Sequence, residues 1–254
     1  MPDRARGVRA ISVRGIPEVR PGDRLVEIIL RALKRQRLRL VSGDILVITH
    51  KVVSKAEGRI VPLRKVAPSA AARRWARRSG SDARVVELAL SECRRVVRMQ
   101  RGVLITETRH GVVCANSGVD LSNVDAGRSA VLLPLDPDRS AEELHHALRE
   151  QLRLSIPVIV TDSVGRPWRE GLTDVAIGVA GMKVFRDYRG RRDPRGYPLK
   201  VTLEAVADEL AAMAALAGGK LSRSPVCIIR GFRYAQGRGR ARDMVRPAAR
   251  DLFR

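Results

Sequence analysis

Two short apolar runs, each followed by an Asp-containing polar turn, constrain the fold of this chain more than any other sequence feature. The runs are VVCA at 112–115 and PVIV at 157–160, and the turns that follow contain Asp120 and Asp162. Short, largely β-branched runs that stop at turn residues predict buried strands. In open sheets flanked by helices, ligands bind at the carboxyl ends of the strands, so Asp162 is expected at the edge of a binding site. Asp120 lies in a turn where Gly118 permits a positive φ.

These two carboxylates allow two interpretations. Carboxylate oxygens suit Mg²⁺ or Mn²⁺, which use few protein carboxylates and leave positions for substrate phosphates. Alternatively, Asp120 and Asp162 are Asx-turn or helix-capping residues that hold no ligand. Spacing alone leaves both interpretations open.

Length and composition indicate a globular protein that works in the cytoplasm. The chain has 254 residues, 44% of them hydrophobic, which is enough for one large domain or two small intertwined ones. No run approaches the 18 apolar residues of a membrane span, and the charged N-terminus has no signal-peptide core. Cys93, Cys114 and Cys227 lack the spacing of a disulfide framework or a zinc site, so buried thiols are expected.

The formal net charge of +22 makes nucleic-acid binding the rival hypothesis. A basic surface attracts polyanions, and the Arg- and Gly-rich segment 230–240 resembles RNA-binding tails. Only 3% of the residues are aromatic, however, which leaves few stacking platforms for bases, and no helix-turn-helix, RRM or KH signature is present. We therefore expect no specific nucleic-acid partner.

Apolar periodicity predicts interleaved helices and strands without repeats. Helices are expected at 25–38, 67–101 with a break at 79–81, from a capping box at Ser140 onward, and at 201–216 before Gly218 and Gly219. Strands are expected at 44–49 and 225–229, with Lys55 in the loop after the first of them. His145 and His146 are then helix-surface residues rather than metal ligands. Neither a P-loop nor a dinucleotide-binding glycine motif is present.

Several longer strings carry a resemblance that covers the chain from about residue 10 to residue 231. Together with the two Asp-containing turns, they are similar to the coenzyme F420-0:L-glutamate ligase family, called CofE. The strings are GIPE at 15–18, HKVVSKAEGR at 50–59, LDPD at 135–138 and GLTDVAIG at 171–178. The resemblance implies an α+β CofE-like fold of two intertwined lobes with mixed sheets and flanking helices. It also implies a homodimer.

The resemblance implies a role for individual residues. Asp120, Asp162 and Ser163 would hold Mg²⁺ or Mn²⁺, and Arg166 and Arg169 would grip the anionic substrate. Lys55 joins Asp120 and Asp162 as the expected catalytic residues. GTP would be bound by Ile16, Pro17, Glu18, Val19, His50, Lys51, Lys55, Asn123, Gly218, Gly219 and Lys220. The loop 217–224 is shorter and more basic than the family pattern, which leaves the nucleotide base contacts open.

The activity that the resemblance implies is amide formation driven by GTP. Members join the amino group of L-glutamate to the terminal carboxylate of coenzyme F420-0, through an acyl phosphate. The alternative of a catalytically inactive F420-binding relative is disfavoured because both Asp residues and Lys55 are present. We expect a single ligase domain over residues 1–254, without the flavin-reductase-like domain fused to some bacterial relatives.

The charge hypothesis makes a prediction. If the positive charge causes only non-specific attraction, RNA and DNA bind weakly, because every phosphate contact releases counterions that added salt opposes. Fluorescence anisotropy with labelled oligonucleotides should show affinity falling on the order of a hundredfold between about 50 and 200 mM salt. Tight, sequence-selective binding at physiological salt would instead support the nucleic-acid hypothesis.

Overall fold

The computed structural model describes residues 7–251, and its central element is a five-stranded mixed sheet. The strands β2 and β8 are parallel, and the other three neighbouring pairs are antiparallel. Helices together with mixed sheets confirm the α+β class. The strand order is β1 (Arg9–Val13), β12 (Val226–Arg230), β2 (Ile45–Thr49), β8 (Val158–Arg166) and β9 (Arg169–Ala180).

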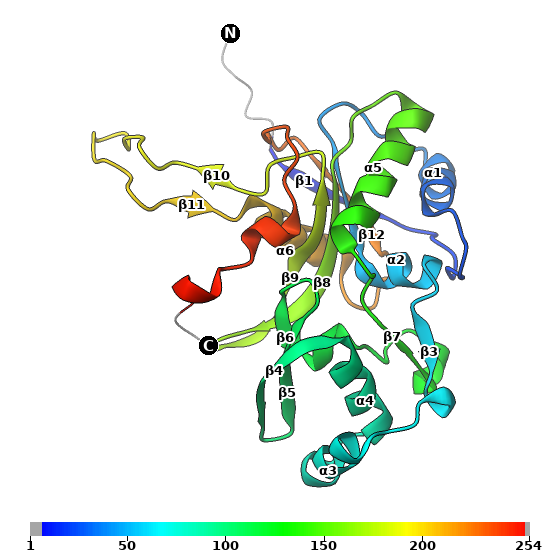
Figure 1. The fold of residues 1–254 in the computed structure, drawn as a ribbon. Coiled ribbons are helices and arrows are strands. Elements are labelled where there is room, and N and C mark those ends of the chain that lie inside the picture. The colour runs from blue at the N-terminus through cyan, green and yellow to red at the C-terminus, as the bar shows by residue number, and fades with distance from the viewer. Residues whose placement is uncertain (1–6, 252–254) are drawn as a thin grey trace.

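Helices cover both faces of this sheet (Figure 1). The helices α1 (Leu25–Arg35) and α5 (Pro137–Leu152) share one apolar core with the sheet. The helix α6 (Val206–Gly218) belongs to the core on the opposite face. Among the described residues, no helix is long and apolar enough to cross a membrane.

Strand β2 shows why the central strands are apolar at every position. Leu46 and Ile48 pack in the core with α1 and α5, whereas Ile45 and Val47 pack in the core with α6. Successive side chains of a strand point to opposite faces, and here both faces are covered. The result is the continuous run ILVIT rather than an alternation of apolar and polar residues.

A second group of elements follows β2 in the chain and packs around smaller cores (Figure 1). Trp75 and Leu104 belong to one of these cores, between two helices and a three-stranded antiparallel sheet. The two helices are α3 (Ala70–Ser79) and α4 (Ala83–Glu92), and the sheet contains β4 (Cys93–Gln100), β5 (Val103–Thr108) and β6 (Val113–Ala115). Helix α2 (His50–Ala56) directly follows β2, and its Val53 packs in the core with α1 and α5. A two-stranded ribbon is formed by β3 (Ile60–Pro62) and β7 (Ser129–Val131).

The remaining elements are short. A long hairpin that carries β10 (Arg186–Asp187) and β11 (Leu203–Glu204) projects from the body of the molecule (Figure 1). Five 3-10 turns complete the described chain: η1 (Leu63–Lys65), η2 (Asn116–Gly118), η3 (Asp125–Gly127), η4 (Ala241–Met244) and η5 (Ala248–Arg250).

Two predictions about the site segments are wrong in detail. Lys55 lies in helix α2, not in a loop, because the chain turns into a helix directly after β2. Asp162 does not end its strand, because β8 continues to Arg166 through pairing with β9. The parallel pairing of β8 with β2 does stop at Thr161, one residue before Asp162.

Three predicted helix boundaries are also wrong. The helical prediction for 67–101 fails after Glu92, where β4 begins and pairs with β5. The helix expected at 201–216 begins only at Val206, because Leu203 and Glu204 pair across the projecting hairpin. The C-cap at Gly219 is confirmed. Helix α5 begins three residues before the capping box, at Pro137, with Asp136 as its N-cap.

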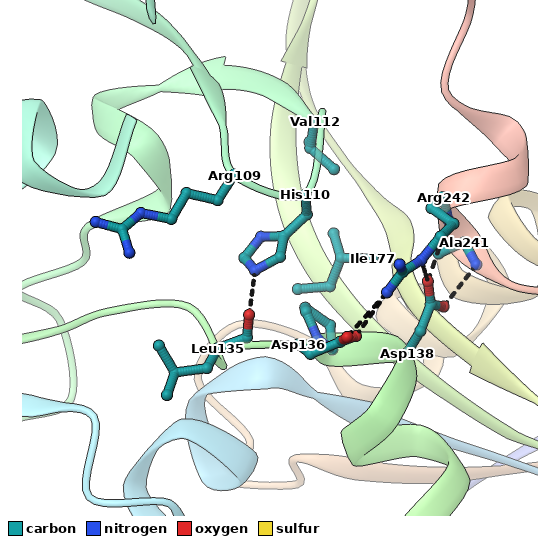
Figure 2. A pocket seen from close by; sticks show the side chains of 10 residues that line it. Arg109, His110, Val112, Leu135, Asp136, Asp138, Ile177, Ala241 and Arg242 are labelled. Atoms are coloured by element: carbon teal, nitrogen blue, oxygen red, sulfur yellow. Dashed lines mark hydrogen bonds and ion pairs between the residues drawn. The ribbon is translucent and has the colours of Figure 1, made fainter. Parts of the chain in front are cut away.

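The start of α5 is fixed by a buried carboxylate. Asp138 accepts hydrogen bonds from the backbone N–H of Ala241 at 2.7 Å and from the Arg242 guanidinium at 3.0 Å (Figure 2). It also accepts one from the backbone N–H of Val179 at 3.0 Å. Asp136 accepts two more bonds from Arg242. These bonds join helix α5, strand β9 and the C-terminal segment.

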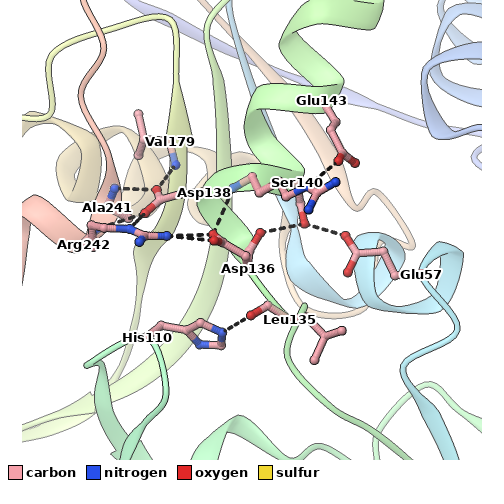
Figure 3. A network of polar contacts seen from close by, with 11 residues as sticks. Glu57, His110, Leu135, Asp136, Asp138, Ser140, Glu143, Val179, Ala241 and Arg242 are labelled. Carbon is pink, nitrogen blue, oxygen red and sulfur yellow. Dashed lines mark hydrogen bonds and ion pairs between the residues drawn. The ribbon is translucent and has the colours of Figure 1, made fainter.

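The same network reaches helix α2 (Figure 3). The Ser140 hydroxyl donates to Glu57 at 2.5 Å and to the Asp136 carbonyl at 3.1 Å. Burial raises the pKa of Glu57 above its ordinary value, although the bond from Ser140 opposes that rise. Ser140 is therefore a link between α2 and α5 inside the helix and not its N-cap.

The close approach of β9 to α5 requires a glycine. A Cβ atom on Gly178 would lie 2.0 Å from the Pro137 carbonyl oxygen, so Gly178→Ala forces the strand and the helix apart. We expect a loss of about 1–3 kcal/mol in the free energy of unfolding, as for other overpacked cores. Urea denaturation of Gly178→Ala against Gly165→Ala provides the measurement. Gly165 lies in the neighbouring strand with nothing within 4 Å of its added Cβ, and equal losses in both variants would refute the contact as the cause.

Candidate functional site

Lys55 is a buried cation at the end of helix α2. Its side chain is 6% exposed, and its Nζ donates to Glu18 Oε1 at 2.5 Å and to the backbone carbonyl of Asn123 at 2.7 Å. Glu18 itself is 72% exposed. A buried ammonium is costly unless it is paired, so its burial distinguishes Lys55 from an ordinary surface lysine.

Lys51 lies one turn earlier on the same helix and contacts the turn that carries Asp120. Its Nζ lies 2.7 Å from Asp120 Oδ2 and 2.5 Å from the Ser122 hydroxyl. Burial by itself raises the pKa of the Asp120 carboxyl, but bonds from Lys51 and Ser122 outweigh it, and this pKa lies below its ordinary value. The backbone N–H of Ser122 also donates to Asp120 Oδ1 at 2.6 Å, so Asp120 supports its own turn as well.

His50 faces Asp162 at the end of the parallel strand pair. Thr49 of β2 pairs with Thr161 of β8, so His50 and Asp162 each follow the last paired residue of their strand. His50 Nε2 lies 3.2 Å from Asp162 Oδ1, and its side chain is 2% exposed. This nitrogen is buried and makes no hydrogen bond of good geometry with any described residue.

Ser163 lies between a carboxylate and a lysine. Its hydroxyl donates to Asp174 Oδ1 at 2.5 Å, and the hydroxyl oxygen of Ser163 in turn accepts a hydrogen bond from Lys220 Nζ at 2.8 Å. Sequence reasoning missed Asp174, although it stands in the string GLTDVAIG. Its proximity to Ser163 depends on the register of β8 and β9, which pairs the two residues across the strands.

These contacts bring together most of the residues that the sequence predicts for the site. Lys55 joins the 16–19 segment to the 120–123 turn, Lys51 joins helix α2 to that turn, and Lys220 joins the loop after α6 to β8. Ile16 is half-buried, Pro17 is exposed and Val19 is buried. Gly218 and Gly219 end α6, and the Ser222 hydroxyl contacts the Gly218 carbonyl.

Arg166 and Arg169 are the two predicted residues that do not join this set of contacts. They are exposed at the end of the hairpin between β8 and β9, where Arg166 donates to the Glu170 carbonyl. At about 3.3 Å per strand residue, Arg166 is roughly 13 Å along β8 from Asp162. The arginines are therefore on the periphery of the site.

The turn that carries Asp120 and Asn123 has an unusual backbone. Positive φ angles occur at Ser117, Asn123, Asp125 and Ala126 in addition to Gly118. Such angles cost free energy for residues other than glycine and are maintained only where the surroundings enforce them. The buried Ser117 is held by its hydroxyl bond to the Ala89 carbonyl and by a bond from its N–H to Thr106. Packing therefore dictates the shape of the turn.

The carboxylates of this region suit a hard metal ion whose other ligands are phosphate oxygens. Asp120 and Asp162 present carboxylate oxygens, and each lies against a nitrogen of Lys51 or His50. Within residues 7–251, no three His, Cys, Asp or Glu side chains form a group that could hold a metal alone. Mg²⁺ and Mn²⁺ accept such a sparse protein set when phosphates supply the other ligands.

A cavity of about 220 Å³ lies beside the start of α5 and has a different chemical character (Figure 2). It is bordered by His110, Asp136 and Arg242, with apolar Val112 and Ile177. Its Asp136 and Arg242 bind each other, and the His110 Nε2 donates to the Leu135 carbonyl. None of the lysines described above lines this cavity.

The cysteines are free, as expected, and two of the three are buried. Burial raises the pKa of Cys114 to about 12 and that of Cys227 to about 11. Cys93 is only half-buried, which corrects the prediction of three buried thiols. Nucleophilic thiolate chemistry at neutral pH is therefore not supported at Cys114 or Cys227.

This is an α+β protein in which lysines and carboxylates lie near the end of a parallel strand pair. Such an arrangement can bind and orient anionic groups. Residues 15–231 match the model of the F420-0:Gamma-glutamyl ligase family, so the chain belongs to this family of ligases.

Curated relatives cover nearly all of the chain. Coenzyme F420:L-glutamate ligase of Methanopyrus kandleri is 43% identical over 256 residues, 98% of this chain and 99% of the relative. The protein of the same name from Methanothermobacter thermautotrophicus is 43% identical over 251 residues, again 98% and 99%. That of Archaeoglobus fulgidus is 40% identical over 248 residues, 97% of this chain and 96% of the relative.

Proposed function

We propose that this chain is a GTP- and divalent-metal-dependent ligase that attaches L-glutamate to the terminal carboxylate of coenzyme F420-0. The names of its relatives support the substrates. The observation that carries the proposal is the convergence of Lys51, Lys55 and Lys220 with Asp120 and Asp162. Three ammonium groups and two carboxylates on neighbouring segments suit a bound triphosphate and its metal.

GTP binding needs partners for phosphate, ribose and base. Lys51 and Lys55 bind the phosphates. In the structure each lysine forms an ion pair with a carboxylate, and a phosphate can replace that carboxylate. The carboxylate bound by Lys55 is that of Glu18, which is largely exposed and free to swing away. The segment 16–19, His50, Asn123 and the loop Gly218–Lys220 border the same region and complete the proposed nucleotide site.

The chemistry follows from the inertness of a carboxylate toward amines. Transfer of the γ-phosphoryl group to the terminal carboxylate of the substrate gives an acyl phosphate and releases GDP. The amine of glutamate then attacks the acyl carbon, the C–O bond to phosphate breaks, and the amine loses a proton as the amide forms. Lys51 and Lys55 hold the phosphates in line and offset their negative charge.

Asp120, Asp162 and Ser163 would hold the Mg²⁺ or Mn²⁺. When bound, the metal supplies further neutralisation of the charge on the transferred group. Arg166 and Arg169 are exposed and available for the phosphodiester or carboxylates of the substrate. We further expect a cytoplasmic homodimer, as in the family that the sequence resembles.

The nucleotide prediction tests the proposal directly. Purified protein is incubated with coenzyme F420-0, L-glutamate and Mn²⁺, and mass spectrometry measures the glutamyl adduct. Far more adduct is expected with GTP than with ATP at equal concentration, because the family resemblance at Lys51, Lys55 and Asn123 implies GTP as the nucleotide. Equal rates would remove base recognition from the proposal, and no adduct with either nucleotide would refute the ligase itself.

The carboxylate prediction separates a catalytic from a structural role. Asp120→Asn and Asp162→Asn keep size and most hydrogen bonding but remove the charge that a hard cation prefers. We expect turnover to fall about 10²–10³-fold, as for the loss of a preorganised electrostatic group, with the fold retained. Turn-supporting residues would instead lower stability by about 0.5–2 kcal/mol and leave turnover nearly intact. Initial rates and melting temperatures of each variant decide between the two roles, residue by residue.

A further inference from the structure

Asp174 is a carboxylate at the edge of the proposed site. Neither the family resemblance nor the proposed mechanism assigns it a role. It is half-buried on β9, directly opposite Ser163. Its Oδ1 accepts the Ser163 hydroxyl at 2.5 Å, and its Oδ2 lies 3.5 Å from the Thr161 hydroxyl, the limit of a hydrogen bond. Within the described chain, it makes no ion pair with a lysine, arginine or histidine within 4.0 Å.

The hydroxyl of Ser163 has one proton and two lone pairs. The Ser163 O–H donates its hydrogen bond to Asp174, because a carboxylate oxygen is an acceptor. Lys220 donates a hydrogen bond to one lone pair of the Ser163 oxygen. The other lone pair is left for a further partner. The direction of the O–H bond is therefore fixed by the protein before any ligand arrives.

We propose that Asp174 is a positioning residue that orients the Ser163 hydroxyl so that its remaining lone pair is available to the metal ion. This inference rests on the proposed function, because it takes Ser163 as a metal ligand. A carboxylate that accepts a hydrogen bond from a metal ligand makes the ligand oxygen more electron-rich. Such hydrogen-bond partners also orient the ligands of metal sites. Lys220 donates a hydrogen bond to the Ser163 oxygen and places a positive charge beside it.

The buried His50 is a second polar group at this place. Its Nε2 makes no hydrogen bond of good geometry with a described residue and lies 3.2 Å from Asp162 Oδ1. Asp162 adjoins Ser163 in the sequence, directly after the last paired residue of the β2–β8 pair. A metal that joins Asp162 and Ser163 adds positive charge next to a carboxylate that lacks a lysine or arginine partner among residues 7–251.

A double-mutant cycle tests this role. Mn²⁺ binding is measured by calorimetry and by the loss of the free-ion electron-spin signal, with a non-hydrolysable GTP analogue present. The variants are Ser163→Ala, Asp174→Ala, their combination and Asp174→Asn. Melting temperatures without metal report on folding, and Asp174→Asn preserves an acceptor if the alanine variant folds poorly.

Each alanine variant is expected to weaken Mn²⁺ binding about 10- to 100-fold, and the double variant should bind no more weakly than Ser163→Ala. Asp174→Asn should show a smaller loss because its amide oxygen still accepts. The matched control is Asp208→Asn, since Asp208 also bonds β9, at the Ala176 N–H, but has no contact with Ser163. Its Mn²⁺ affinity should be unchanged.

Other outcomes overturn the inference. Additive losses in the double variant would mean that Asp174 acts independently of Ser163. Undiminished binding by Asp174→Ala, with Ser163→Ala impaired, would refute Asp174 alone and leave the proposed metal site standing. A wild-type protein that binds no Mn²⁺ with the nucleotide analogue would refute the metal site and the inference together.

Discussion

The parallel pairing of β2 with β8 is the interaction on which the rest of the site depends. These strands are far apart in the sequence, yet their register pairs Thr49 with Thr161 at the point where both lose their partner. The residues that follow are His50 and Lys51 at the start of helix α2, and Asp162 and Ser163 on β8. A register shift of one residue would turn these side chains toward the opposite face of the sheet. The apolar residues of β2 are buried on both faces, which keeps this strand inside the sheet.

Charge balance is the second constraint. Removing an ammonium from water costs on the order of several kcal/mol, and here that cost is offset by specific acceptors. Lys55 has Glu18 and the Asn123 carbonyl, and Lys51 has Asp120. These acceptors come from segments that are distant in the sequence, and the apolar core shared by Val19 and Val53 also brings the segment of Glu18 to helix α2. The lysines therefore hold the turn and the N-terminal segment in place, and the same positive charge suits the phosphates of the proposed substrate.

The scaffold around these groups is stiff at two points. Asp138 ties α5, β9 and the C-terminal segment through backbone and guanidinium bonds, and Gly178 lets β9 approach the start of α5. The turn with Asp120 is supported from below by Ser117, whose bonds reach α4 and β5. Rigid support of this kind matters because electrostatic positioning loses its effect when the groups can rearrange.

Local sequence patterns determined much of the fold and most of the site. The apolar runs gave the cores of β2, β8 and β12, the 3.6-residue period gave α1, and the quoted strings gave the family to which the chain belongs. Both kinds of pattern arise from residues close together in the chain, so they can be read without a structure.

Tertiary structure decided what depends on distant segments. Lys55 was expected in a loop but lies in a helix, β8 runs past Asp162 because β9 pairs with it, and residues 93–100 form a strand because β5 lies beside them. No local pattern marks the bond between Ser163 and Asp174 or the reach of Lys220 to Ser163. Sequence period determines which residues are buried, but the partner of a polar side chain is determined by strand register, which only the folded chain establishes.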